Sequence, residues 1–194
     1  MAARNTKERY GAIAQALHWI VALLFLGAYC AVYYRHWFTV KKTPENIIAA
    51  QLHFSFGITI AVFVLLRVLY RLWDMQPDPP AGPLWQRICA KVSHYGLYFF
   101  MIAMPLTGYL GTGANTKWFY LFEVPSFKST AAFKTVVEGW MGLTWKAFEA
   151  PLDAFHHFCG ESLVWMLIAI HVCAALYHHY HLKDTVLTRM MPGK

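Results

Sequence analysis

Long apolar segments alternate with short polar ones along the chain, a pattern typical of helices that cross a membrane. A window of about twenty residues, the length of helix that spans a bilayer, finds four candidate spans. They cover residues 13–34, 46–73, 88–111 and 153–181, approximately. We therefore predict an all-α protein, an integral membrane four-helix bundle that forms one domain over residues 1–194.

The connections between the spans also carry structural signals. Thr43 and Pro44 are typical of an N-cap and a first helical residue, so the second helix is expected to begin there. Residues 74–83 hold four prolines and a glycine, which predicts a tight link. The longest connection, residues 112–151, contains a segment at 128–140 that is expected to form a short interfacial helix.

Composition and charge support the membrane assignment and give an orientation. The chain is 58% hydrophobic and 14% charged. Its net charge of +7 does not indicate nucleic-acid binding, because the basic residues flank apolar segments and form no basic domain. If both termini are cytoplasmic, that side holds ten of the seventeen Lys and Arg residues. The positive-inside rule favours this arrangement, so both termini are expected in the cytoplasm.

Five histidines lie in or near the predicted spans, at two depths. His18, His94 and His171 fall toward the cytoplasmic side, whereas His53 and His157 fall toward the opposite side. On a regular helix, residues fourteen apart share a face to within about 40° and are separated by about 21 Å along the axis. His157 and His171 have this spacing. The outer pair is therefore predicted to be His53 with His157, while the inner site has three candidates for two positions.

Histidine inside a bilayer is a functional hypothesis by default, although any single one can be structural and bond a neighbouring helix. Two pairs across a bundle favour two haems with two imidazole ligands each. Zinc or copper would instead gather three or four ligands at one point. The four cysteines form no CxxC or CxxCH motif, so covalent haem attachment is not indicated. His156 points about 60° away from the face of His171 on a regular helix and is expected at the membrane interface.

Several motifs around these histidines resemble those of the bacterial cytochrome b561 family, four-helix di-haem proteins of the inner membrane. They are ALHW around His18, QLHFSFG around His53, SHYGLYFF around His94, and the final block HHFCGESLVWMLIAIHVCAALYHHYHLKDTVLTRMMP. The chain is also similar to the cytochrome b subunits of membrane-bound hydrogenases and formate dehydrogenases, whose fourth span supplies a histidine to both haems.

The resemblance implies two haem b groups in a multi-pass protein of the bacterial inner membrane. It implies His18 and His171 as axial ligands of the inner haem iron, and His53 and His157 as those of the outer one. His94 is then left free for contact with a quinone. The competing roles for His94 are a bond to a haem propionate or simple packing.

The function implied by the resemblance is that of a quinone-linked oxidoreductase of the respiratory chain. Electrons would pass between a periplasmic donor, with superoxide as a candidate, and ubiquinone or another membrane quinone. An anionic donor would suit Lys41, Lys42 and the lysines of residues 112–151. One alternative is a cytochrome b anchor subunit that relays electrons for a partner dehydrogenase. Another is a haem-free transporter or structural bundle.

Overall fold

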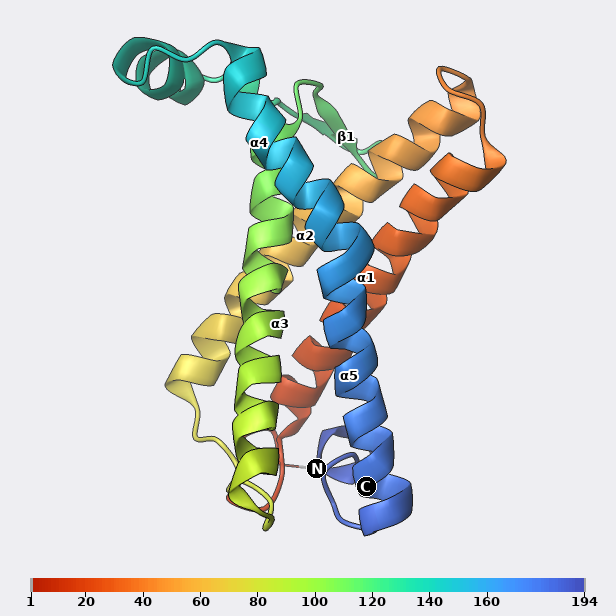
Figure 1. Ribbon diagram of the computed structural model, residues 1–194, viewed down its shortest axis with the longest axis vertical. Coiled ribbons are helices and arrows are strands. Elements are labelled where there is room, and N and C mark those ends of the chain that lie inside the picture. The colour runs from red at the N-terminus through yellow and green to blue at the C-terminus, as the bar shows by residue number, and fades with distance from the viewer. Residues whose placement is uncertain (1, 194) are drawn as a thin grey trace.

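Four long helical segments build the computed structural model, which describes residues 2–193 (Figure 1). Three of them are α1 (Ala12–Phe38), α2 (Pro44–Trp73) and α3 (Leu84–Gly111). The fourth runs without a break from Trp145 to Leu182. It consists of α4 (Trp145–Phe158), η3 (Cys159–Leu163), α5 (Val164–Tyr177) and η4 (His178–Leu182), in which η3 and η4 are π-helical. The prediction of a mostly helical chain with long apolar helices is confirmed.

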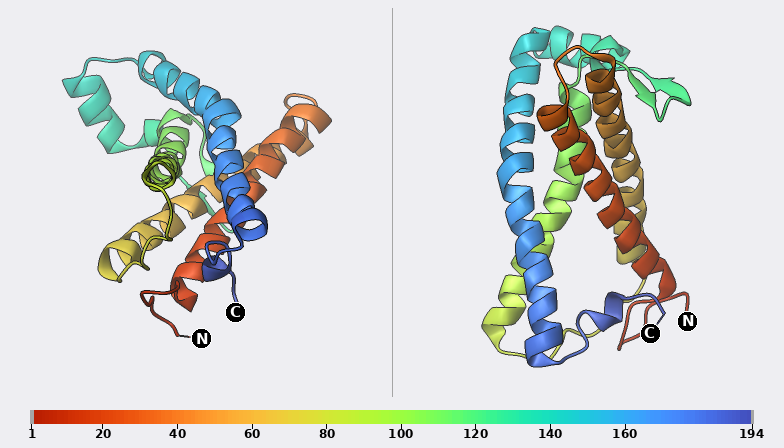
Figure 2. Two further views of the ribbon diagram at one scale, coloured as in Figure 1. Left: turned by 60° about the horizontal axis from the view of Figure 1, so that its bottom comes forward. Right: turned by 90° about the vertical axis from the view of Figure 1, so that its right-hand side faces the viewer.

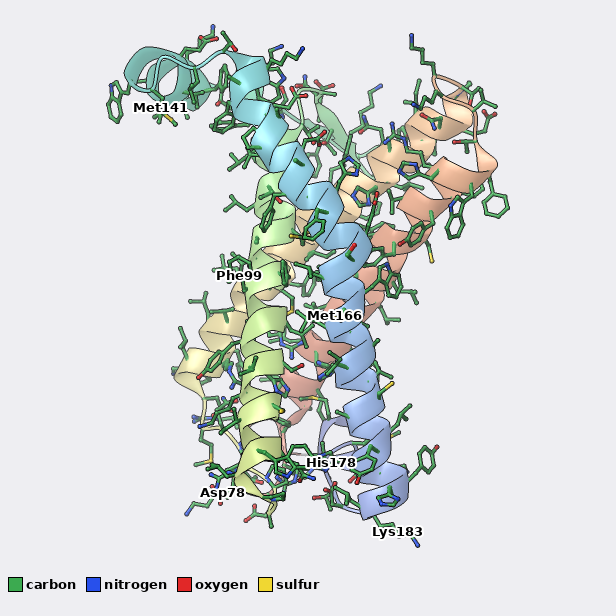
Figure 3. The ribbon with its side chains drawn as sticks, viewed as in Figure 1. Asp78, Phe99, Met141, Met166, His178 and Lys183 are labelled. Atoms are coloured by element: carbon green, nitrogen blue, oxygen red, sulfur yellow. The ribbon has the colours of Figure 1, made fainter. Side chains whose placement is uncertain are left out.

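Three of the four segments are long and apolar enough to cross a membrane: α1, α2 and Trp145–Leu182. Only 17%, 17% and 11% of their most apolar windows are buried inside the protein. Large apolar side chains such as Phe99 and Met166 lie on the outer surface (Figure 3). Such surfaces are stable in lipid rather than in water, and the protein is therefore a multi-pass membrane protein.

Helix α3 differs from the predicted span at residues 88–111. It is long enough, but among the described residues it is not one of the helices that reach the apolarity of a span. The reason is its composition, since several tyrosines and glycines together with His94 and Pro105 interrupt its apolar part. It packs against α2, α4 and α5 and runs beside the fourth segment (Figure 2).

The helices pack as two halves that spread apart, as the right-hand view of Figure 2 shows. Helix α1 packs on α2 around a cluster of Val21, Ala28, Ile60 and Val64. Helix α3 packs on the fourth segment around a second cluster, formed by Met104, Cys159 and Val164. Phe25 packs against both clusters. The buried apolar residues therefore form two clusters, which Phe25 connects.

Helix boundaries agree with the prediction for α2 and differ for the fourth segment. Thr43 caps α2 by accepting a hydrogen bond from its backbone, as predicted. The fourth segment begins well before the predicted residue 153, because the Thr144 side chain caps it through the Ala147 N–H. Pro151 lies inside α4 and does not end it. Proline inside a helix removes one backbone hydrogen bond, a loss that neighbouring groups can make good in a membrane helix.

The connection at residues 112–144 contains a β-hairpin, which departs from the all-α prediction. Strand β1 (Thr116–Trp118) pairs antiparallel with β2 (Phe122–Val124). The hairpin is fixed to α2, since the Lys117 N–H donates to Gln51 Oε1 (2.7 Å) and the Phe119 N–H donates to Ser55 Oγ (2.9 Å). Two short helices follow, η1 (Phe127–Ser129) and η2 (Phe133–Trp140). The latter lies in the segment where a short helix was predicted.

The N-terminal segment, the link at residues 74–83 and the C-terminal tail meet at one end of the bundle (Figure 1). Gln15 Nε2 and Trp19 Nε1 donate to the carbonyls of Arg189 and Met190 in the tail, which contains η5 (Thr188–Met190). The Arg189 guanidinium in turn donates to the Asp78 carbonyl (2.7 Å). Both terminal segments therefore lie on the same side of the membrane. Which side this is stays a prediction.

A buried carboxylate fastens the N-terminal segment to the end of α2. The side chain of Asp74 is 1% exposed and pairs with the Arg4 guanidinium at 3.0 Å. It also accepts hydrogen bonds from the Asn5 N–H (2.9 Å) and the Tyr70 hydroxyl (2.7 Å). The Asn5 backbone hydrogen bond and then the Tyr70 hydroxyl favour the charged form, so they lower the Asp74 pKa from 3.8 to about 2.

We predict that Asp74→Asn releases the N-terminal segment, because the amide cannot pair with Arg4 or accept all three donors. Trypsin cleavage after residues 4, 7 and 9 in detergent should become several-fold faster. Because the folded-state pKa is depressed, the wild type should hold the segment above pH 3.8 and lose it as the pH falls toward 2. Asp78→Asn is the control, because within residues 2–193 only the backbone of Asp78 makes hydrogen bonds. Equal cleavage of the two variants would contradict the assignment.

Candidate functional site

Two imidazole rings face each other at the end of the bundle that carries the hairpin. His53 on α2 and His156 on α4 have ring centroids 6.2 Å apart and perpendicular planes. The Ala28 carbonyl can only accept, so His53 Nδ1 donates to it (2.9 Å). Thr107 already donates its hydroxyl proton to the Ala103 carbonyl, so His156 Nδ1 donates to Thr107 Oγ1 (3.2 Å). Both rings therefore carry the proton on Nδ1 and keep the Nε2 lone pair for a ligand.

His157 does not take the position predicted for it opposite His53. Its side chain is 55% exposed and lies beside two carboxylates, with Asp153 at 3.9 Å and Glu161 at 3.6 Å. His156, which was expected at the interface, faces His53 instead. The structure thus brings together His53 and His156, and leaves His157 on the outside of the bundle.

The π-helical turn η3 explains this exchange of neighbours. A π turn accommodates one more residue than an α-helical turn and so shifts the register by about 100°. His156 and His171 are fifteen residues apart in the sequence, with η3 between them. The extra residue of the π turn gives them the same relative direction as two residues fourteen apart on a regular α-helix, so they share a face. The Tyr29 hydroxyl donates to the Gly160 carbonyl inside this turn (2.8 Å). Helix α1 therefore supports the turn that selects which histidine faces inward.

Three histidine rings meet at the opposite end of the bundle. The ring of His171 on α5 lies 6.1 Å from His18 on α1 and 5.4 Å from His94 on α3. His94 Nδ1 donates to the Ala90 carbonyl of its own helix (2.6 Å), and its side chain is exposed. His18 Nδ1 is buried without a hydrogen-bond partner within residues 2–193. A buried polar atom without a partner is costly, which indicates that a group outside the polypeptide completes this environment.

The distances between ring centroids show which histidine pairs could hold a metal ion between them. Two metal–imidazole bonds of about 2 Å each, together with the two ring radii, span about 6 Å. His53–His156 and His18–His171 both have this separation, at 6.2 and 6.1 Å, whereas His94–His171 is closer. Within residues 2–193 no three His, Cys, Asp or Glu side chains are arranged so that they could hold one metal ion together. The geometry therefore fits two irons with two protein ligands each and does not fit a zinc-type cluster.

The structure also leaves room for a flat group beside the outer pair. Gly57 lies one turn after His53 on the same helix face, and a Cβ there would meet nothing within 4 Å. Gly108 on α3 allows the His156 ring to lie close to that helix, since a Cβ at this position would lie only 3.0 Å from His156 Cε1. Open space in the middle of a long helix is unusual in a packed bundle, and a macrocycle held by the two imidazoles would fill it.

Comparisons with known proteins agree with this geometry. A sequence profile of the family described as prokaryotic cytochrome b561 matches residues 9–193. "Cytochrome b561 homolog 2" of Escherichia coli strain K12 is 32% identical, over 98% of this chain and 95% of its own length. "Cytochrome b561 homolog 1" of the same organism is 31% identical, over 92% and 94%. "Probable superoxide oxidase CybB" of Yersinia pestis is 29% identical, over 96% and 98%.

We predict that Gly57→Leu lowers the haem content from two groups per chain to one. The larger side chain occupies the space beside His53 without a clash in the protein itself, so the helices should still form. The measurement is the haem-to-protein ratio of the purified variant, with circular dichroism as the check on helix content. Gly57→Ala, which fills far less space, is the matched control and should retain most of the haem. Full haem content in Gly57→Leu would show that the gap does not hold the macrocycle.

Proposed function

Because the chain belongs to the prokaryotic cytochrome b561 family, whose members bind haem b in bacterial membranes, we propose that it transfers electrons across the inner membrane through two haems. The observation that carries this proposal is the pair of equal ring separations at opposite ends of one bundle. When bound, haem b supplies one-electron chemistry, while the protein sets its ligands, position and access. The positive-inside rule favours both termini in the cytoplasm, and the proposal adopts this orientation.

The proposed axial ligands follow from the ring pairs. His18 and His171 hold the inner haem, and His53 holds the outer haem together with His156. The fourteen-residue spacing of the sequence makes His157 the competing outer ligand, which would require the fourth segment to lose its π turn. The hydrogen bonds from Nδ1 of His53 and His156 fix their tautomers and ring orientations. Ala28 and Thr107 are therefore positioning residues for the outer site.

At the outer end, the proposed electron donor is superoxide, which the name of the Yersinia relative suggests. The connection between α1 and α2, which contains Lys41 and Lys42, and the lysine-containing segment at residues 112–151 both lie at this end of the bundle (Figure 1). Lys117 belongs to the hairpin that is hydrogen-bonded to α2 at Ser55, two residues from His53. An exposed cation there would attract an anionic donor at low ionic strength.

At the inner end, the proposed acceptor is ubiquinone or another membrane quinone. Two superoxide anions each lose one electron to become O₂, and the quinone takes up two electrons and two protons to become a quinol. His94 is suited to contact the quinone, because its Nδ1 is bonded to Ala90, its side chain is exposed and Nε2 is free among the described residues. An imidazole can accept a proton at one ring nitrogen and donate one from the other.

The first prediction of this proposal concerns haem content in single histidine variants. His18→Ala, His171→Ala, His53→Ala and His156→Ala should each lose one of two haem b groups, whereas His94→Ala and His157→Ala should keep both. The measurement is a haem count per polypeptide with a reduced-minus-oxidised spectrum. His94→Ala should lose quinone reduction while keeping its haems.

A deletion separates the two outer ligands more sharply. Removing Ser162 from η3 should convert the π turn to a regular α-helical turn and leave His156 on the face of His171, so both haems should remain. If His157 is the wild-type ligand, the deletion turns it away and brings His156 into its place, so the full chain would lose a haem in His157→Ala and the deletion variant would lose one in His156→Ala. Loss of haem in His157→Ala together with its retention in His156→Ala would restore the pairing predicted from the sequence. A colourless wild type would end the redox proposal.

A further prediction concerns the donor. Lys117→Glu should slow reduction by superoxide several-fold at low salt, and the difference should shrink as ionic strength rises. Lys91→Glu is the matched control, because Lys91 is an exposed lysine on α3 toward the opposite end. Equal slowing in both variants would indicate a general charge effect and contradict a role for the hairpin.

An anchor subunit, the alternative function, would show no turnover with superoxide and quinone unless a partner dehydrogenase were added.

A further inference from the structure

Two arginines of α2 stack on one tyrosine of α3 at the inner end of the bundle. The guanidinium carbon of Arg67 lies 5.6 Å from the ring centroid of Tyr98, and that of Arg71 lies 5.2 Å from it. Arg67 Nε also donates to the Tyr98 hydroxyl at 3.4 Å. One aromatic ring therefore holds two positive charges in a fixed position, one helical turn apart.

Neither arginine has a carboxylate partner within residues 2–193. The nearest acid along the chain is Asp74, but its oxygens are already bonded to Arg4, Asn5 and Tyr70. Arg71 bonds only the neutral amide of Gln76 (2.9 Å). Arg67 is partly buried on an apolar helix. A partly buried cation without a carboxylate partner is costly, so Arg67, with the exposed Arg71 one turn farther along α2, calls for an anionic oxygen from outside the polypeptide.

The positions along α2 show which way the arginines point. Arg67 follows His53 by fourteen residues and Arg71 follows it by eighteen, so all three share one face to within about 40°. Gly57, beside the open space, lies on the same face. Arg67 is about 21 Å farther along the helix than His53, which places it at the depth of the inner histidines. It lies within electrostatic range of His18, His94 and His171.

We propose that Arg67 and Arg71, held together by Tyr98, bind the propionate carboxylates of the haem between His18 and His171. This proposal rests on the proposed function. The carboxylates have the geometry that a guanidinium fork recognises with two parallel hydrogen bonds. The arginines thereby neutralise the propionates, fix the rotation of the macrocycle about the axis between its ligands, and raise the reduction potential of that haem above the value it would have without them.

The test is a redox titration of the purified protein in which both haems are followed separately. Arg67→Gln should shift the midpoint potential of one haem downward and leave the other unchanged, because a lost positive charge destabilises the reduced form. Arg71→Gln should shift the same haem, and the double variant should shift it further or lose it. Arg67→Lys keeps the charge but not the fork, so it should shift the potential less than Arg67→Gln and should retain the haem even if the glutamine variant does not.

Arg87→Gln is the control, because Arg87 is an exposed arginine in the first turn of α3. It should leave both potentials unchanged. The proposed binding of propionates by Arg67 and Arg71 would be overturned if their variants showed no shift in midpoint potential. It would also be overturned if the Arg67, Arg71 and Arg87 variants all shifted both haems equally.

The other source of anionic oxygen is phospholipid phosphate. A shift seen only in vesicles of phosphatidylglycerol, and absent in phosphatidylcholine alone, would assign the arginines to lipid and overturn the proposal. Fewer than two haems in the wild type would overturn the proposed function, and with it the proposed binding of propionates by Arg67 and Arg71.

Discussion

The need to hold two pairs of imidazole rings about 6 Å apart inside an apolar bundle governs the architecture of this protein. Helices in a membrane gain stability by close packing, but a ring pair with a group between its members requires that opposite helices stay apart. The structure meets both demands by dividing its core. Helices α1 and α2 pack around Val21 and Ile60, and α3 packs on the fourth segment around Met104 and Cys159. The histidine pairs cross the space between these halves.

The fourth segment supplies one histidine to each pair, so its internal register matters more than that of any other helix. The π turn between His156 and His171 sets this register, and π turns are often found at functional sites. Its carbonyl at Gly160 accepts from the Tyr29 hydroxyl. Tyr29 is itself packed against Trp165 with ring centroids 4.5 Å apart. The proposed outer ligand thus depends on contacts between α1 and the fourth segment, and not on the histidine's own surroundings alone.

Hydropathy alone was enough to predict the helical class, the extents of α1 and α2, and the two depths at which histidines gather. The cap at Thr43 was predicted because its signal is local. The signals that were missed depend on tertiary contacts. No residue pattern in CGESL marks a π turn, and without that turn the arithmetic of a regular helix favours His157 over His156. The β-hairpin likewise depends on Gln51 and Ser55 of α2, which are more than sixty residues away in the chain. Arg67 and Arg71 look like ordinary interfacial residues until Tyr98 is placed beside them.

The carboxylate of Asp74 has a consequence for biogenesis. It joins residues 4 and 5 to the end of α2, so residues 4–74 form a closed helical hairpin whose two ends are tied together. Every partner in that closure has been synthesised before α3 begins at Leu84. The α1–α2 hairpin can therefore enter the bilayer and lock as a unit while the rest of the chain is still on the ribosome. The segment with Arg189 and Met190, which bonds Gln15 and Trp19, is synthesised after all four helical segments and can join the hairpin only after them.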